Sequence, residues 1–133
     1  MWYYNGKIFD NSIDDWYGFV YLITEKSTDK KYIGKKFFWK KKTLPPLKGQ
    51  KRKRRSVVES DWKTYYGSND LLNENVQKNP DDYHREILHL CKKRGDCAYY
   101  EAKEQFDRKV LFDKQYYNEF IGCKIHSKHL THE

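Results

Sequence analysis

Two strand-like segments, Gly18–Thr24 and Lys31–Lys35, constrain the fold of this chain more than any other feature. Both contain aromatic and β-branched residues, and the polar residues Glu25–Lys30 between them favour a turn. We therefore expect an antiparallel hairpin in which Tyr21 and Tyr32 are equally far from the turn. Their side chains would lie directly opposite one another on one face, with β-carbons about 5 Å apart. A shift of one residue in the pairing would put them on opposite faces.

The basic residues are concentrated in one segment. Thirteen of the 27 Lys and Arg lie in residues 30–55, which hold no Asp or Glu, and the other fourteen are set against all 19 acidic residues. A basic segment on a mildly acidic body is typical of a surface that binds a polyanion such as nucleic acid. Two alternatives are a solvated run of charge and a nuclear-localisation peptide, for which Lys51–Arg55 would suffice.

Length and composition indicate one folded domain. A chain of 133 residues can bury one core. Only 38% of the residues are hydrophobic, but 17% are aromatic, which favours folding over disorder. Cys91, Cys97 and Cys123 form no C-x-x-C pair, and no apolar run reaches membrane-spanning length. We therefore expect a reduced, intracellular protein without zinc at these cysteines.

The spacing of apolar and turn residues predicts an α+β fold. Prolines and a glycine interrupt the basic stretch at about 36–60, which we expect to leave the second strand as a loop or arm. The other predicted elements are a strand near Trp2–Tyr4, a short helix at Asp61–Gly67, a helix at Ser68–Lys78 capped by Ser68, a strand at Tyr83–Cys91 and a helix at Asp96–Leu111 capped by Asp96. Together they predict a small sandwich, a three-stranded, mainly antiparallel sheet flanked by helices with a basic insertion after the second strand. The chain would form a single domain over residues 1–133, with its core at about 16–122 and a loose tail at about 124–133.

Glu101 is the acidic residue best placed for chemistry. It lies inside the strongest predicted helix, flanked by apolar and aromatic neighbours. It is either a sheltered carboxylate or an ordinary solvated glutamate three residues before Glu104, and without other information the solvated interpretation is favoured. A sheltered Glu101 would be enough to hold Mg²⁺, which often takes only one or two protein carboxylates.

Four short motifs occur in order along the chain. The first two are Phe19-Val20-Tyr21 and Tyr32-Ile33-Gly34, whose tyrosines are eleven residues apart, and Tyr99-Tyr100-Glu101 and Tyr117-Asn118 follow. In these motifs the chain resembles the GIY-YIG nuclease superfamily, and in particular its small phage-encoded endonucleases. The resemblance spans about residues 18–118, and its order of elements agrees with the predicted one.

The resemblance implies hydrolysis of DNA with one metal ion. Glu101 would hold a single Mg²⁺ or Mn²⁺ against the scissile phosphate, and Tyr21 would accept or relay the proton of the attacking water, with Tyr32 close by. The ordinary pKa of tyrosine, about 10, is too high for a base at neutral pH, so Lys35 would stabilise the phenolate. Asn118 would support the site by hydrogen bonding.

The resemblance also bears on location and assembly. A phage-encoded enzyme of this kind would act in the cytoplasm of a bacterial host, without a membrane. A domain of this size holds one active site, so double-strand cleavage would need a homodimer or two successive nicks. The expected products carry a 5′-phosphate and a 3′-hydroxyl.

One position departs from the superfamily pattern. Relatives place a catalytic arginine on a helix about three turns after the second motif, but the residue ten positions after Tyr32 is Lys42. Either Lys42 replaces it as a point charge, or the basic segment returns Arg52, Arg54 or Arg55 to the phosphate. The departure leaves open an alternative function, a non-catalytic nucleic-acid-binding protein on the same scaffold.

The basic insertion is the expected nucleic-acid-binding surface. Trp39 offers a stacking or wedge group among lysines, whereas Phe37 serves equally well as a core residue. The residues that we expect to contact DNA are Lys36, Trp39, Lys40, Lys41, Lys48, Lys51, Arg52, Lys53, Arg54 and Arg55. Phosphate contacts of this kind give affinity but carry no sequence information.

Overall fold

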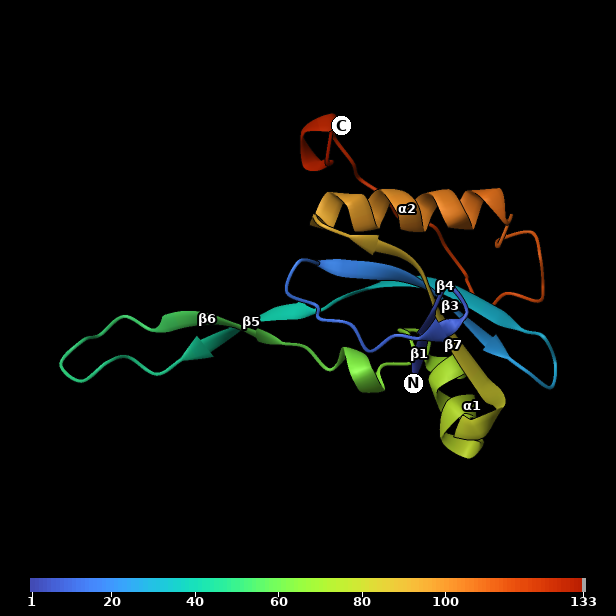
Figure 1. Ribbon diagram of the computed structural model, residues 1–133, viewed down its shortest axis with the longest axis horizontal. Coiled ribbons are helices and arrows are strands. Elements are labelled where there is room, and N and C mark those ends of the chain that lie inside the picture. The colour runs from blue at the N-terminus through green and yellow to red at the C-terminus, as the bar shows by residue number, and fades with distance from the viewer. Residues whose placement is uncertain (133) are drawn as a thin grey trace.

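The computed structural model describes residues 1–132 as a twisted sheet between helices, with a two-stranded ribbon that projects from one end (Figure 1). The strands are β1 (Trp2–Tyr4), β2 (Lys7–Ile8), β3 (Gly18–Glu25), β4 (Lys31–Phe37), β5 (Trp39–Leu44), β6 (Arg54–Glu59) and β7 (Tyr83–Cys91). The helices are α1 (Asp70–Lys78) and α2 (Arg94–Asp107), with single 3₁₀ turns at Trp62–Thr64, Pro80–Asp82 and Ser127–His129. Within residues 1–132, no helix has the length and apolar character needed to cross a bilayer.

The main sheet has five strands in the order β2-β1-β7-β3-β4. β1 runs parallel to β7, and the other neighbours are antiparallel. The predicted α+β class is confirmed, but the predicted count of three strands is wrong. The chain reverses at Asn5 and Gly6, both with positive φ, so that its first eight residues add two strands to the far edge.

The predicted register of the tyrosine hairpin is wrong by two residues. Tyr21 pairs with Gly34, and Tyr32 pairs with Ile23. The two phenols still share one face, as expected, but they are diagonal neighbours with ring centroids 6.2 Å apart. The turn lies where it was predicted, since Thr24 and Lys31 on either side of it are paired. Tyr21 is three residues before Thr24 but Tyr32 is only one residue after Lys31, so the two tyrosines are not equally far from the turn.

β3 is buried on both faces because a separate core packs on each side of the sheet. Phe19, Tyr21 and Ile23 join the aromatic core on the side of α1, whereas Val20 and Leu22 join a smaller core under α2. This double burial explains why the sequence of β3 is almost continuously apolar. It also places the tyrosine of the first motif deep inside the molecule.

The segment between the ribbon and α1 departs from prediction. The expected helix at Asp61–Gly67 is a single 3₁₀ turn at Trp62–Thr64, because Arg85 takes two backbone carbonyls of this segment as acceptors. The cap of α1 is Asn69 rather than Ser68: its side chain accepts a hydrogen bond from the backbone of the first helical turn. Ser68 is thereby free to contact the cavity described below.

α2 begins two residues earlier and ends four residues earlier than predicted, so Asp96 lies within its first turn and is not its cap. The Asp96 carboxylate is buried and accepts hydrogen bonds from the backbone N–H of Thr131 at 2.8 Å and from its hydroxyl at 2.5 Å. The tail predicted to be loose is therefore attached to the start of α2. The last residue of that predicted tail, Glu133, lies outside the described residues.

The stretch predicted as a loop or arm is a β-hairpin. β4 continues to Phe37, and Phe38 is fully buried, so the projecting part begins only at Trp39. β5 and β6 pair along their whole length, and residues 45–53 connect them at the distal end. In Figure 1 this hairpin extends away from the body, and we refer to residues 39–59 as the ribbon.

Candidate active site

A cavity of about 320 Å³ opens where β4, the base of the ribbon and α2 meet. It is lined by Tyr21, Tyr32, Gly34, Lys35, Lys36, Phe37, Trp39, Lys40, Ser60, Asp61, Ser68 and Glu101. Four of the residues predicted to be catalytic, two tyrosines, a lysine and a glutamate, thus share one cavity. We call it the motif cavity.

Gly34 makes room for the phenol of Tyr21. The two residues are direct partners in the sheet, and the Tyr21 side chain lies across the space above Gly34. A β-carbon added at Gly34 would lie 2.6 Å from Cζ of Tyr21, well inside van der Waals contact. Tyr21 is only 1% exposed and cannot move away, so the second motif needs glycine to seat the tyrosine of the first.

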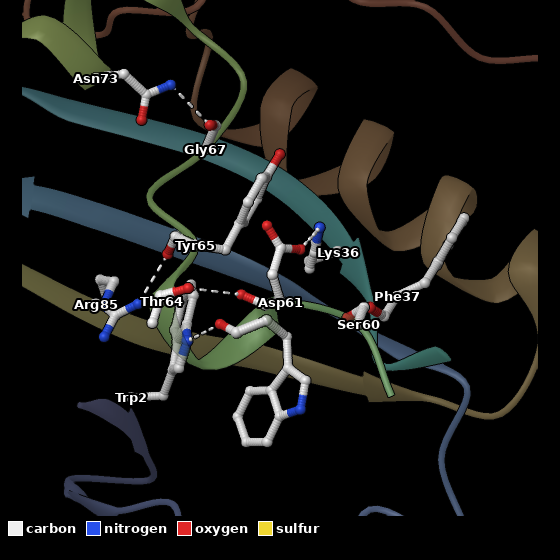
Figure 2. Close-up of polar contacts among 11 residues, drawn as sticks. Trp2, Lys36, Phe37, Ser60, Asp61, Thr64, Tyr65, Gly67, Asn73 and Arg85 are labelled. Carbon is white, nitrogen blue, oxygen red and sulfur yellow. Dashed lines mark hydrogen bonds and ion pairs between the residues drawn. The ribbon is translucent and has the colours of Figure 1, made fainter. Parts of the chain in front are cut away.

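Tyr65 forms a wall behind the motif cavity, beside the lining residues Tyr21 and Lys36, and Arg85 binds its backbone (Figure 2). The ring of Tyr65 meets that of Tyr21 edge-on, with centroids 5.9 Å apart. The guanidinium of Arg85 donates to the backbone carbonyl of Tyr65 at 2.8 Å and lies between the rings of Trp2 and Tyr66, 4.7 and 4.2 Å from their centroids. Arg85 is buried, and its role is to position this wall.

Lys36 lines the motif cavity and reaches Asp61 (Figure 2). Its Nζ lies 2.7 Å from Oδ1 of Asp61 and 4.1 Å from the ring centroid of Tyr65. The hydrogen bond from Lys36 is the main reason why the pKa of Asp61 lies below its ordinary value. Asp61 is therefore an ionised partner for a cavity lysine.

Glu101 reaches the motif cavity from α2 and pairs with Lys35. Their Nζ and Oε1 atoms are 3.1 Å apart, and the Glu101 side chain is only 14% exposed. Burial raises the pKa of the Glu101 carboxyl, and the Lys35 ammonium opposes that shift. Of the two alternatives for Glu101, a sheltered carboxylate or a solvated one, the structure shows the sheltered carboxylate.

The two motif tyrosines are protonated phenols in the free protein. Burial, together with the neighbouring Tyr65 and Tyr32, raises the pKa of Tyr21 well above its ordinary value. Burial also raises the pKa of Tyr32, although a hydrogen bond with Ser68, 3.0 Å between the hydroxyl oxygens, partly offsets it. Both shifts favour the protonated phenol, so the expected stabilisation of a phenolate by Lys35 stays a prediction.

Asn118 lies outside the motif cavity and acts on the backbone of β4. Its Oδ1 accepts from the N–H of Ile33 at 3.0 Å, and its Nδ2 donates to the carbonyl of the same residue at 2.8 Å. Two backbone hydrogen bonds join Lys31 to the residues just before Asn118. The N–H of Lys31 donates to the carbonyl of Gln115, and the N–H of Tyr117 donates to the carbonyl of Lys31, both at 2.7 Å. The segment around Asn118 thus continues the sheet beyond its edge strand and fixes the strand that carries the second motif.

The other predicted residues divide between the motif cavity and the ribbon. Lys36, Trp39 and Lys40 line the cavity, and the Trp39 indole donates to the carbonyl of Trp16 at 2.9 Å. The predicted residues on the ribbon outside the cavity are Lys41, Lys42, Lys48, Lys51, Arg52, Lys53, Arg54 and Arg55. Neither alternative for the missing arginine lies in the cavity, because both Lys42 and the three arginines are on this projecting hairpin.

Sequence reasoning missed Ser60, Asp61 and Ser68, which line the cavity, and the Tyr65 wall behind them. Asp61 and Tyr65 were assigned to a short helix, Ser60 to the end of the basic stretch and Ser68 to the cap of the next helix. A usable signal was the composition of this segment: two serines, an aspartate and a tyrosine follow the basic stretch directly. Arg85 carried no such signal, because it looks like the polar residue of an alternating strand.

The residues of the motif cavity fit a single divalent cation. Among residues 1–132 no cluster of three or more His, Cys, Asp or Glu side chains is placed to bind a metal. A hard cation such as Mg²⁺ needs only one or two carboxylates when water and substrate phosphate complete its shell. Both carboxylates of the cavity pair with a lysine, but Glu101 is sheltered whereas the Asp61 side chain is 68% exposed, so Glu101 meets that requirement best.

Comparison with known families agrees with this geometry. The family described as "Putative endonuclease segE, GIY-YIG domain" matches residues 2–121, nearly the whole chain. The chain belongs to this GIY-YIG family. The match begins at β1, so the two edge strands lie within the family domain and not in a lead-in before it. No curated protein and no solved structure matches the chain.

Proposed function

We propose that this GIY-YIG protein is a divalent-metal-dependent DNA endonuclease. The observation that carries the proposal is the convergence of Tyr21, Tyr32, Lys35 and Glu101 on one cavity. These residues come from two strands and a helix, and Glu101 is 66 positions from its lysine partner. A glutamate with no role beyond solvation would be expected to point into solvent and not into this cavity.

Each cavity residue has a role in phosphodiester hydrolysis. Mg²⁺ or Mn²⁺ bound at Glu101 would supply positive charge to the scissile phosphate and a bound water. Lys35 neutralises Glu101 in the free protein and, once the carboxylate has another partner, is positioned to contact a phosphate oxygen. Asn118 is a positioning residue, since it holds the backbone of β4 and touches no cavity atom.

We propose that Tyr21 relays a proton and does not act as a standing base. Its raised pKa keeps the hydroxyl protonated at neutral pH. A phenol can accept the proton of the attacking water while passing its own proton to an oxygen of the substrate phosphate, and this needs no stable phenolate. Tyr32, whose ring lies diagonal to that of Tyr21, would orient the same water or the phosphate.

Lysines of the motif cavity take the place of the missing arginine in this proposal. Lys36 and Lys40 line the same cavity as the tyrosines, whereas Lys42 lies farther out on β5. A lysine stabilises transition-state charge as a point charge and cannot grip two phosphate oxygens at once. We therefore expect slower cleavage than an arginine would give.

A second candidate function is DNA binding without cleavage. It is favoured by one observation, namely that no arginine among residues 1–132 lines the motif cavity, while the ribbon carries nine of the 27 basic residues. In that case the Lys35–Glu101 pair would be a structural ion pair. The two functions predict the same DNA affinity but opposite outcomes in a cleavage assay.

Cleavage of supercoiled plasmid with Mg²⁺ separates the two functions. The comparison needs the parent protein, Glu101→Ala and an EDTA control, and it should cover Mn²⁺ as well. Metal-dependent nicking or linearisation that is lost in Glu101→Ala supports the endonuclease. Intact plasmid, together with a retained gel shift, favours the binding protein.

A further inference from the structure

The ribbon has two faces with different surroundings. In its register, Lys40, Lys42 and Arg54 project to one side, since their sheet partners are Val58, Ser56 and Leu44. Lys41 and Arg55 project to the other side, with Trp39 and Glu59. We call these the Lys42 face and the Lys41 face.

The Lys42 face is continuous with the motif cavity. At the base of the ribbon Lys40 lines that cavity, and its charge contributes to lowering the pKa of Asp61. The next basic side chains on the same face, Lys42 and Arg54, extend the positive charge outward along the hairpin. The acidic side chains Asp61 and Glu101 are confined to the cavity, where each pairs with a lysine. Outward from Lys40 this face carries no acidic residue, so a polyanion bound at the cavity can follow it.

The Lys41 face begins beside acidic residues. Its basal residue Glu59 lines a second, larger cavity of about 630 Å³ together with Asp10 and Asp14. Only one basic residue, Lys63, lines that cavity. Phosphates that approached along the Lys41 face would meet this acidic surface at the base of the ribbon.

The cations of the ribbon have no acidic partners. Among residues 1–132, no ion pair involves any of the ribbon's lysines or arginines. By contrast, Lys35 and Lys36 in the motif cavity are both paired. Unpaired exposed cations are free to replace the counterions of DNA, which is the main source of electrostatic affinity.

Shape and composition indicate duplex DNA as the partner. A two-stranded ribbon fits the major groove, which is about 12 Å wide. Residues 40–58 contain no aromatic side chain, whereas proteins that bind single strands stack bases on aromatic rings. Six paired residues per strand span about 20 Å, which corresponds to about six base pairs.

We infer that the Lys42 face of the ribbon lies in the major groove of duplex DNA, on one side of the phosphate held at the motif cavity. This inference rests on the proposed function, since it takes DNA to be the substrate. It gives Lys42 a role in binding, outside the chemistry. It also makes the ribbon an arm that contacts DNA on one side of the cut only, over about six base pairs.

Two double variants test the inference because they remove the same two residue types from opposite faces. Lys42→Gln/Arg54→Gln changes the Lys42 face, and Lys41→Gln/Arg55→Gln is the matched control. The control is demanding, since Arg55 also lines a basic cleft near the ribbon tip. Affinity is measured in EDTA by fluorescence anisotropy, with a 20-base-pair duplex and its single strand, over a range of salt.

The Lys42-face double is expected to weaken duplex binding about tenfold or more and to lower the salt slope by about two. The control should weaken duplex binding only about twofold. The two charges that it removes make no phosphate contact and act only from a distance, within about one Debye length of 10 Å. The parent should prefer duplex to single strand, and that preference should shrink in the Lys42-face double. Melting curves of both doubles verify that the fold is intact.

Three results would overturn the inference. They are an equal loss of duplex affinity in the two doubles, a larger loss in the control, and a parent that binds single strand as tightly as duplex. If the parent nicks plasmid and the two doubles bind alike, only the assignment of the ribbon face is wrong. If the parent binds no DNA of either kind, the proposed function falls together with it.

Discussion

The motif cavity and the ribbon are both basic, but they hold their charges in different ways. In the cavity Lys35 and Lys36 each face a carboxylate at 3.1 Å or less, and buried aromatic rings limit how far any side chain can move. On the ribbon the cations are exposed and have no acidic partner within residues 1–132. Paired charges in a packed site are suited to chemistry, and free charges on a projecting hairpin are suited to affinity.

Removing one oxygen from the cavity should show this division most strongly. Tyr21→Phe keeps the buried ring and deletes the hydroxyl that relays the proton, so the cleavage rate should fall about 10²- to 10⁴-fold. Duplex affinity in EDTA should stay the same. Single-turnover cleavage with Mg²⁺ measures the rate, and Tyr99→Phe, on the exposed side of α2, is the matched control. A Tyr21→Phe protein as fast as that control would remove Tyr21 from the mechanism.

Gly34→Ala should damage the cavity through packing alone. Its β-carbon would collide with the Tyr21 ring, and overpacking a core of this kind costs about 1–3 kcal/mol. Cleavage should drop with stability, while the ribbon should still bind duplex DNA. Gly122→Ala is the control, because its nearest neighbour would be 3.9 Å away. Chemical denaturation measures both variants, and equal stability would show that Tyr21 has room to move.

The sequence was sufficient to predict most elements but not the register that joins them. The strand at Tyr83–Cys91 was predicted to the residue, since apolar and polar positions alternate and a proline-containing turn precedes it. The tyrosine register was missed although the turn was predicted, because Tyr21 lies three residues before the paired Thr24 while Tyr32 lies one residue after Lys31, the partner of Thr24. The strand near Trp2–Tyr4 was predicted, but its place in the sheet was not, because its pairing with β7 joins residues more than eighty positions apart. The short β2, which pairs with β1, was missed.

Asn118→Ala should disturb the cavity indirectly. The change removes both hydrogen bonds to Ile33 and leaves its N–H without a partner on the edge strand, which costs about 1–3 kcal/mol. Hydrogen exchange at the Ile33 amide should become faster, and cleavage should slow without any change at the ribbon. Asn11→Ala, at an exposed loop position, serves as the control. Unchanged exchange at Ile33 would mean that Asn118 does not position β4.

Glu25→Gln should give the smallest effect, and one that depends on pH. The Glu25 carboxylate accepts hydrogen bonds from the hydroxyls of Tyr83 and Tyr117 at 2.8 and 2.7 Å. Partial burial would raise its pKa, but these hydrogen bonds outweigh burial and hold the pKa below its ordinary value. A carboxylate with a lowered pKa stabilises the fold above its unfolded pKa, about 4.3, and loses that contribution as the pH falls.

The Glu25→Gln variant should therefore be less stable than the parent by about 1–2 kcal/mol near pH 7. The difference should shrink as the pH falls below about 4. Urea denaturation at several pH values measures it, with Glu74→Gln as the exposed control, whose lysine pair is worth little. A difference that grows in acid would contradict the hydrogen-bond account.

The candidate site was predictable in its chemistry and not in its surroundings. Tyr21, Tyr32 and Glu101 were found from short motifs, because such motifs are local in sequence. The Tyr65 wall and its Arg85 support depend on contacts between segments about twenty residues apart, which no motif records. Lys42, found by counting ten residues on from Tyr32 as in relatives, lies on the ribbon outside the cavity, because the chain forms a hairpin here and not the helix that relatives have.

The division between cavity and ribbon is tested most directly by measuring rate and affinity on the same variants. Glu101→Gln should lower the saturated cleavage rate about a thousandfold or more while its duplex affinity stays within about twofold of the parent. Lys42→Gln/Arg54→Gln should instead weaken duplex binding about tenfold. A Glu101→Gln protein that cleaves at the parental rate would contradict the account, because the sheltered carboxylate of the motif cavity would then have no part in the chemistry.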